Sequence, residues 1–257
     1  MKSVEHFWKI LKTDDVTTDY IWVQGSPRYQ AFDRHRFNAI IWNVFKGAAG
    51  QKLHWDYHQL SMNAHIMILQ EVLIDRNLFG KYALPGFELV HSATYQRRDG
   101  FREGLMIASR SPSVGSRQRI LSRYKEPLVG THKSALVCFY PLIQSEKLMV
   151  INIHSTLFRS LKTAQEEIEH LLASLPEHRG PALLAGDFNT ITPKFLQMII
   201  EKLSAYGFSH VHTDNDPRSD LRILDHIFVK GMGVENLEII DSVKSSDHYP
   251  ISCVFSF

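Results

Sequence analysis

Apolar residues occur along this chain in short runs separated by Gly, Pro, Asn, Asp and Ser, a pattern typical of β-strands. The runs are rich in Val, Ile and Phe. The predicted strands cover residues 39–42, 66–69, 87–95, 105–108, 135–140, 148–153, 182–185, 223–229, 237–240 and 251–255. A chain with so many short strands is expected to build its core from β-sheets.

A few helices interrupt the predicted strands. Residues 4–11 place apolar side chains at helical spacing. A capping box of Thr163 and Glu166 would open a second helix, and Thr192 followed by Pro193 is a typical start for a third. Strands and helices in this arrangement predict α/β layers with a mixed or an antiparallel pair of sheets, and the pattern leaves the topology open.

The chain shows no internal repeat, no low-complexity tract and no linker rich in Pro, Gly or Ser. We therefore expect residues 1–257 to form a single domain. Residues 1–37 would contribute an N-terminal helix and a polar surface segment, and residues 38–257 would form the core.

The overall charge is nearly balanced. The 257 residues include 29 Lys and Arg against 27 Asp and Glu, a formal net charge of +2. This balance excludes a strongly basic, tail-type nucleic-acid binder and an acidic disordered chain. The 14 His make the charge depend on pH near the imidazole pKa.

Cys138 and Cys253 lie in predicted strands, so they are interpreted as small buried thiols rather than as a disulfide. No apolar run is long enough to span a membrane. The N-terminal residues carry charges and lack the apolar stretch of a signal peptide, which favours a cytoplasmic location.

Polar residues lie at the ends of several predicted strands. Asn43, Glu71, His154, Asp187 and Asn189 come after strands, Asp225 lies near the start of one, and Asp247 and His248 come before the last. Groups at strand ends can meet on one rim of a sheet. Carboxylate and amide oxygens suit Mg²⁺, Mn²⁺ or Ca²⁺ better than Zn²⁺. Each motif has an ordinary structural explanation by itself, such as a turn at residues 186–189, but their combination favours a functional site.

In this order the motifs resemble the endonuclease/exonuclease/phosphatase superfamily, which includes deoxyribonuclease I, exonuclease III, neutral sphingomyelinases and inositol polyphosphate 5-phosphatases. The matching segments are residues 41–43, 69–71, 104–110, 152–154, 186–189, 224–226 and 246–248. Within the superfamily the chain resembles a bacterial YafD-like branch, on residues 42–46 and on residues 133–137 before Tyr140-Pro141.

The resemblance implies a four-layer α/β sandwich, in which two mixed sheets pack face to face with helices outside. It implies that Glu71 is the principal ligand of a Mg²⁺ ion, with Mn²⁺ or Ca²⁺ as alternatives. Asn43 would lie beside Glu71, and Asp247 would complete the metal shell.

The resemblance also implies the catalytic roles. Asp187 would orient or deprotonate the attacking water, and Asn189 would point the same way if the segment is extended. His248 would donate to the phosphate, and Asp225 would hold its imidazole and raise its pKa. Water attacking phosphorus in line needs no covalent enzyme intermediate.

His154 separates branches of the superfamily. Exonuclease III and abasic-site endonucleases carry Tyr in a longer motif there, whereas the His resembles the pattern of deoxyribonuclease I, sphingomyelinases and toxin nucleases. The resemblance to deoxyribonuclease I implies that Glu103 pairs with His154, and a solvated Glu is the alternative. His226 is interpreted as a packing residue.

Lys46, Arg97 and Arg98 lie near the motifs and are candidate substrate contacts. A divalent-metal-dependent nuclease acting as a monomer on DNA, or on RNA, is the favoured function. A phosphatase or phospholipase acting on inositol phosphates or sphingomyelin-like lipids is the alternative. A non-enzymatic binding member of the fold is a third possibility, which the complete set of residues disfavours.

Overall fold

The structure is a computed structural model. It describes residues 13–15, 21–33, 36–75, 80–126, 130–143, 146–157, 160–213, 215–218 and 223–257. The helix predicted over residues 4–11 lies outside the described residues. Within them, no helix has the length and apolar character that crossing a bilayer requires.

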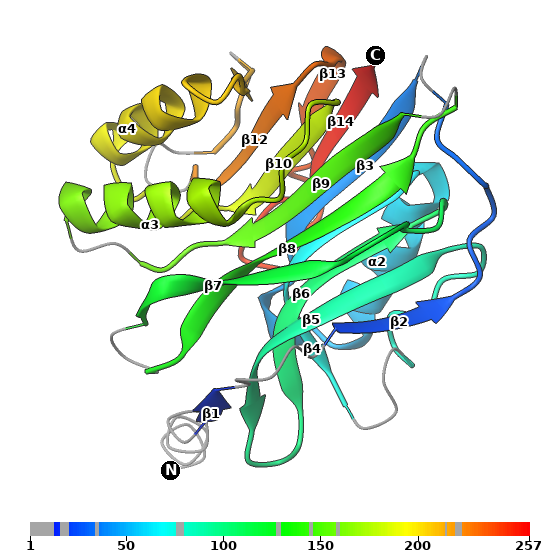
Figure 1. Ribbon diagram of the computed structural model, residues 1–257. Helices are drawn as coiled ribbons and strands as arrows, with labels where there is room; N and C mark the ends of the chain where they lie inside the picture. Colours follow the sequence, from blue (N-terminus) through cyan, green and yellow to red (C-terminus); the bar gives the residue numbers. More distant parts are fainter. Residues whose placement is uncertain are drawn as a thin grey trace.

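Two mixed β-sheets face each other (Figure 1). The larger sheet runs in the order β1-β5-β6-β4-β3-β14-β13, and β2 also pairs with β5. Its strands are β1 (Thr13–Asp15), β2 (Ile21–Gly25), β3 (Phe37–Asn43), β4 (Ile66–Ile74), β5 (Glu88–Arg97), β6 (Arg102–Ser109), β13 (Gly233–Ile239) and β14 (Ile251–Ser256).

The smaller sheet runs in the order β11-β12-β10-β9-β8-β7. Its strands are β7 (Gln118–Lys125), β8 (His132–Pro141), β9 (Lys147–His154), β10 (Ala182–Asp187), β11 (Ser209–Val211) and β12 (Asp225–Lys230). The helices are η1 (Phe45–Gly47), α2 (Gln51–Asn63), α3 (Leu161–Ser174) and α4 (Pro193–Ser204).

Buried apolar side chains pack between the two sheets and also between each sheet and the helices outside it. The molecule is therefore a four-layer sandwich. Alternate residues of β3, such as Ile41, point inward and pack between the sheets, while Trp42 points outward and packs against α2. On the other side α3 and α4 cover the outer face of the smaller sheet. The predicted fold class is confirmed, with helices on the outside of both sheets.

The parallel pairs at the centre of each sheet explain where polar groups gather. In the larger sheet β3 is parallel to β4, and in the smaller sheet β9 is parallel to β10. A helix crosses over between the strands of each pair, α2 in the first and α3 in the second. Asn43, His154 and Asp187 are the last residues of their strands, so this topology brings them to one end of the sandwich.

Several local predictions need correction. Ser160, not Thr163, caps α3, because its hydroxyl accepts from the Thr163 backbone N–H. Helix α2 was not predicted, since it begins after Gly50 without a side-chain cap and buries few residues. The segment 21–25, expected to lie on the surface, forms β2 at the edge of the larger sheet. The start of α4 at Thr192-Pro193 and the two free buried Cys are as predicted.

Two buried amides connect the sheets beneath the site. Gln70 Nε2 donates to Asn152 Oδ1 at 2.7 Å. Asn152 Nδ2 in turn donates to the carbonyls of Leu69 at 2.8 Å and Met106 at 3.0 Å. Because both side chains are fully buried, each bond replaces hydration that the amides lose on folding.

We expect the two amides to be energetically coupled. In a double-mutant cycle with Gln70→Ala and Asn152→Ala, the second substitution should cost less free energy of unfolding once the first is present, by about 1–2 kcal/mol. Urea unfolding of the four proteins measures this coupling. Strictly additive losses would contradict the inter-sheet link.

His91 makes the stability depend on pH. It is fully buried in β5, and burial lowers its pKa to about 4, although the carbonyl of Val72 at 3.3 Å opposes the shift. The unfolded chain has the ordinary value of about 6.5 and binds more protons below it. This contribution therefore destabilises the fold as pH falls from about 6.5 toward 4.

The loss for His91 alone is about 2 kcal/mol between pH 7 and pH 5. Urea unfolding at pH 7 and at pH 5 measures the free energy of unfolding that is lost between the two values. This loss should be smaller by about 2 kcal/mol in His91→Gln than in the unchanged protein. An equal difference in the two proteins would show that His91 does not titrate as its burial requires.

Candidate functional site

The candidate site is built around the carboxylate of Asp187, which ends β10 and is 2% exposed. Asp187 is opposite His154 of the parallel strand β9 and opposite Asp225 of the antiparallel strand β12. Its predecessor Gly186 lacks a side chain at a close approach, since a Cβ there would lie 2.1 Å from the Ile153 carbonyl. The glycine therefore lets the strands meet where the acid is needed.

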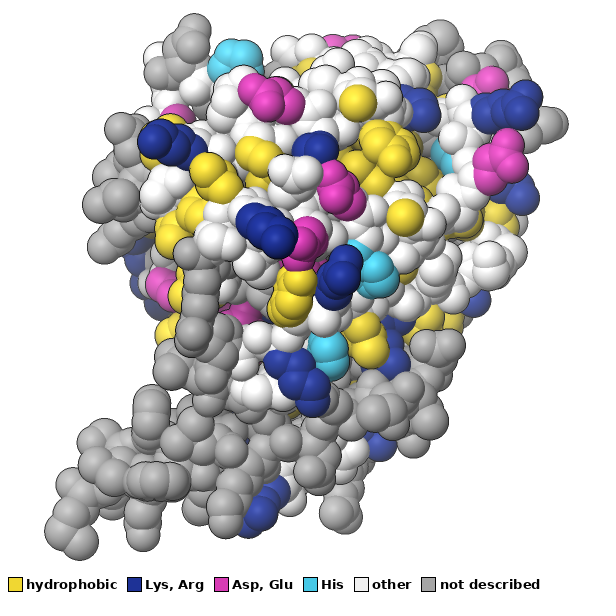
Figure 2. Space-filling model, turned by 60° about the vertical axis from the view of Figure 1, so that its left-hand side comes forward, with side chains coloured by type: hydrophobic (Ala, Val, Ile, Leu, Met, Phe, Trp, Pro, Cys, Tyr) yellow, Lys and Arg dark blue, Asp and Glu magenta, His cyan; other side chains and the backbone are white. Residues whose placement is uncertain are grey.

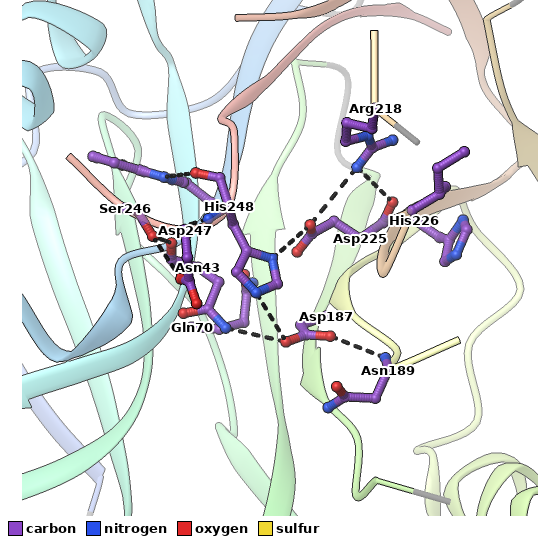
Figure 3. A network of polar contacts seen from close by, with 12 residues as sticks. Asn43, Gln70, Asp187, Asn189, Arg218, Asp225, His226, Ser246, Asp247 and His248 are labelled. Carbon is purple, nitrogen blue, oxygen red and sulfur yellow. Dashed lines mark hydrogen bonds and ion pairs between the residues drawn. The ribbon is translucent and has the colours of Figure 1, made fainter. Parts of the chain in front are cut away.

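Donors surround Asp187 on several sides (Figure 3). Asn43 Nδ2 donates to its Oδ2 at 3.1 Å, and the Asn189 backbone N–H donates to its Oδ1 at 2.9 Å. His248 Nε2 lies 3.9 Å from Oδ2 and can donate to it, whereas His154 Nε2, at 3.5 Å, faces the donor Lys133 and is a neighbour rather than a donor. Burial and, after it, the charge of Asp225 raise the pKa of Asp187, which makes it a better base than a solvated carboxylate.

Asn189 reaches the site by a different route from the one predicted. Its φ of 51° is left-handed, so the segment after Asp187 is not extended. Its side-chain Nδ2 donates to the Ser155 carbonyl at 2.8 Å. The backbone N–H rather than the amide therefore serves Asp187, and the side-chain Oδ1 is left to accept from water or substrate.

His248 is held in one orientation by Asp225. Its Nδ1 donates to Asp225 Oδ2 at 2.8 Å. Its backbone carbonyl accepts from Trp42 Nε1 at 3.0 Å, so the turn before β14 is anchored to β3. Burial opposes a charged imidazole, but the carboxylates of Asp225, Asp187 and Asp247 outweigh it and raise the pKa of His248 to about 10. His248 is therefore a cation with a proton on Nε2 that points toward Asp187.

Arg218 was missed by the sequence analysis and lies behind this pair. Its side chain is 7% exposed, and Nη1 lies 3.7 Å from Asp225 Oδ2. Asp216 binds the other end of the guanidinium at 2.6 Å. Arg218 lies in an irregular segment without a recognisable motif, so no pattern in the sequence pointed to it.

His154 is a neutral imidazole. Lys133 Nζ, which can only donate, lies 3.1 Å from its Nε2. Burial first, and then the charges of Lys133 and His248, lower the pKa of His154 well below its usual value. Lys133 was also missed as a site residue, although it begins the segment 133–137 that distinguished the YafD-like branch.

Glu71 enters the site through a bulge in β4. The register with β6 shifts between Leu69 and Val72, and Glu71 has a left-handed φ of 54°. Its Oε1 lies 3.9 Å from His154 Nε2, and its Oε2 lies 3.4 Å from Lys46 Nζ. The bulge thus turns a residue that strict alternation would place elsewhere toward the rim.

Glu103 does not pair with His154. Its carboxylate accepts from the Tyr95 hydroxyl and lies 3.6 Å from Lys46 Nζ. Burial and the nearby charge of Glu71 raise the pKa of Glu103. The position is therefore in the site region as expected, but its partners are Tyr95 and Lys46, because Lys133 occupies the neighbourhood of His154.

The three basic residues expected to bind substrate have different positions. Lys46 lies between Glu71 and Glu103, and these two acids raise its pKa despite its burial. Arg97 ends β5 and pairs with Asp99 at 2.6 Å. Arg98 is exposed in the turn that follows. Only Lys46 contacts the acidic residues of the site.

The side-chain oxygens of Glu71, Asn43 and Asp247 are suitable ligands for a hard divalent cation. Glu71 Oε2 is buried, and its charged neighbour is Lys46 Nζ at 3.4 Å, so this carboxylate oxygen already lies where positive charge is favoured. Asn43 is paired in register with the residue before Glu71. Asp247 is exposed and connects to Asn43 through Ser246, whose hydroxyl donates to the Asn43 carbonyl at 2.6 Å. These are oxygen ligands of the kind that Mg²⁺ takes.

A second group of potential ligands lies in the same site. Ligand atoms of Asp187, Asp225 and His248 all lie within 4.8 Å of one another. The protonated imidazole already supplies positive charge between these two carboxylates, which accounts for their proximity. We therefore propose Glu71, Asn43 and Asp247 as the ligands of the cation.

Comparison with known proteins agrees with this geometry. The model of the Endonuclease/Exonuclease/phosphatase family matches residues 40–248. A UPF0294 protein of Vibrio vulnificus strain YJ016 is 30% identical over 239 residues, which cover 91% of this chain and 81% of that protein. A UPF0294 protein of Yersinia enterocolitica is 27% identical over 236 residues, 90% of this chain and 88% of that protein.

A solved structure shows the same fold. The endonuclease/exonuclease/phosphatase from Beutenbergia cavernae superposes with a TM-score of 0.67 at 16% identity, covering 87% of this chain and 72% of that one. The family, and the YafD-like branch that the motifs predicted, are both confirmed.

The two ligand groups make opposite predictions for metal binding. Glu71→Gln should weaken Mn²⁺ binding, measured by titration calorimetry, at least tenfold, because it removes a charged ligand. Asp225→Asn should change the affinity less than threefold, because that carboxylate serves His248 instead. The reverse order of effects would assign the ion to the group of Asp187, Asp225 and His248.

Proposed function

The chain belongs to the Endonuclease/Exonuclease/phosphatase family, and from this premise we propose that it is a divalent-metal-dependent nuclease that hydrolyses phosphodiester bonds of DNA. The family acts on phosphoester bonds, so a hydrolase of such bonds is the broader conclusion. The observation that carries the proposal is the buried carboxylate of Asp187 between a neutral His154 and a protonated His248. These groups offer a base and an acid within reach of one phosphate.

In the proposed reaction Asp187 accepts a proton from water, and the water oxygen forms a bond to phosphorus. The P–O bond on the opposite side breaks, and the leaving oxygen takes up a proton from solvent. Asn43 and the Asn189 N–H keep the carboxylate oriented, at 3.1 Å and 2.9 Å. His154 borders the same water position with an uncharged ring. Asp187, which directs the water, and His248, the acid, are held on one rigid rim. In the proposed reaction the water therefore attacks phosphorus in line, and no covalent enzyme intermediate forms.

His248 stabilises the charge that develops on the phosphoryl oxygens. Its proton is already in place, so the site does not reorganise during the reaction. Asp225 and Arg218 are positioning residues, since they act through the imidazole. A divalent cation held by Glu71, Asn43 and Asp247 would supply Lewis-acid stabilisation of the phosphoryl and leaving oxygens.

The charge distribution supports a polyanionic substrate. Once the site acids Glu71, Glu103, Asp187, Asp225 and Asp247 and the site bases Lys46, Lys133 and Arg218 are set aside, 26 basic and 22 acidic residues remain. On the face shown in Figure 2, Lys and Arg side chains are spread among acidic, His and apolar ones. A mildly positive surface of this kind favours a phosphate backbone and makes binding sensitive to salt.

Domain organisation follows the same proposal. Residues 38–257 would form the catalytic unit, since every residue assigned above lies within them. The described residues before 38 contribute β1 and β2 to the edge of the larger sheet, the buried Phe32 to the core and Phe37 to the start of β3.

Substitution of the acid and the base should remove activity. In the presence of Mg²⁺, Asp187→Asn and His248→Ala should each lower kcat at least 100-fold on bis-p-nitrophenyl phosphate and on plasmid DNA. His58→Ala, which removes an exposed imidazole of α2, is the control and should retain full activity. Circular dichroism confirms that each variant is folded.

A panel of substrates separates the proposal from its alternative. The same proteins are assayed on single-stranded DNA, RNA, inositol phosphates and sphingomyelin vesicles. Cleavage of lipid or inositol phosphate without cleavage of nucleic acid would reject the nuclease function. Full activity of Asp187→Asn or His248→Ala would overturn the assigned roles.

A further inference from the structure

An exposed aromatic residue lies directly beside the site in an unfavourable backbone conformation. Phe45 is 43% exposed and has a φ of 44°. The next residue, Lys46, has a φ of 56°. Two consecutive residues other than glycine are rarely left-handed, because Cβ crowds the following carbonyl.

The strain at Phe45 is not repaid by packing. Phe45 belongs to none of the buried core clusters, and among the described residues its ring stacks on no other ring. A strained residue with an exposed apolar side chain indicates a role in binding rather than in stability. Glycine would adopt this backbone without strain, yet the chain carries a large aromatic ring here.

A hydrogen bond holds the Phe45 backbone next to the reacting groups. The Phe45 backbone N–H donates to Asn43 Oδ1 at 3.0 Å, and the same amide group donates to Asp187. Lys46, the following residue, lies 3.4 Å from Glu71. In the sequence Phe45 therefore lies between Asn43, whose side chain contacts the proposed base Asp187, and Lys46, whose side chain contacts the proposed metal ligand Glu71.

We propose that Phe45 is a stacking platform for the nucleobase adjacent to the scissile phosphate, an inference that rests on the proposed function and names its substrate as an unpaired strand. Proteins that bind single-stranded nucleic acid use exposed aromatic rings on which successive bases stack. A base can stack on the ring only when it has left its own duplex.

The local sequence favours a base over a lipid surface. After Lys46 the loop continues as Gly47, Ala48, Ala49 and Gly50, which add little apolar area around the ring. Insertion into a membrane needs a contiguous apolar patch, whereas stacking of one base needs a single ring.

The test measures binding in the His248→Ala background, where substrate is not consumed. Two fluorescent 20-mers of equal charge are compared in Mg²⁺, one of thymidine and one with abasic tetrahydrofuran in place of each nucleoside. Phe45→Ala should weaken binding of the thymidine strand about 10-fold, the effect of one lost base stack, and leave the abasic strand within twofold. Phe45→Trp should restore the preference.

The control is Trp55→Ala on α2, which removes a ring that is 65% exposed and lies outside the site. It should leave both affinities unchanged. Equal weakening of the two strands by Phe45→Ala, no weakening of either, or a loss confined to sphingomyelin vesicles would overturn the stacking role.

Two further measurements keep the possible failures apart. The melting temperature of Phe45→Ala should stay within about 2 °C of the unchanged protein, whereas a fall of more than 5 °C would make Phe45 a structural residue. Hydrolysis of bis-p-nitrophenyl phosphate by the unchanged protein tests the phosphodiesterase independently. If the unchanged protein hydrolyses this substrate but does not prefer the thymidine strand, only the stacking role of Phe45 is rejected. If it does not hydrolyse the substrate, the proposed function is rejected.

Discussion

The buried carboxylate of Asp187 is the constraint on which the rest of the site depends. An ionised group at 2% exposure is costly unless donors and positive charge replace its hydration. Asn43 and the Asn189 N–H supply the donors, and the protonated His248 supplies the charge. The carboxylate of Asp225 in turn stabilises the charged form of the His248 imidazole. Each contact of this network therefore stabilises the next. The same arrangement has the properties that hydrolysis of a phosphodiester requires.

Irregular backbone delivers the side chains that regular strands could not. Glu71, at the bulge within β4, and Asn189, after the end of β10, are left-handed, so regular strand alternation does not direct them. Phe45 and Lys46 share this conformation immediately after β3. All four lie at the end of the sandwich where the parallel pairs β3/β4 and β9/β10 terminate. The buried amides of Gln70 and Asn152 connect the two sheets just below, so a rigid base supports the strained rim.

Much of this was predictable from the sequence, for physical reasons. Short apolar runs, as in residues 39–42, predict strands of the core, and polar residues at the strand ends, in a recognisable order, predict the family and most of the candidate site residues. Contacts between distant segments were not predictable. Arg218 lies behind Asp225 in an irregular segment without a motif. Lys133 begins the segment 133–137, but only the pairing of β8 with β9 brings it beside His154. Asn189 is left-handed, and Glu103 contacts Tyr95 and Lys46 rather than His154. The local sequence does not show these contacts, because they depend on which distant segments pack nearby.

The central claim is that water activated by Asp187 attacks phosphorus directly. The stereochemical course at phosphorus tests it most directly, using a dinucleoside phosphorothioate of known configuration hydrolysed in ¹⁸O-labelled water with a divalent metal. A single in-line displacement predicts inversion of configuration at phosphorus. Retention would require a covalent enzyme intermediate and would contradict the role of Asp187.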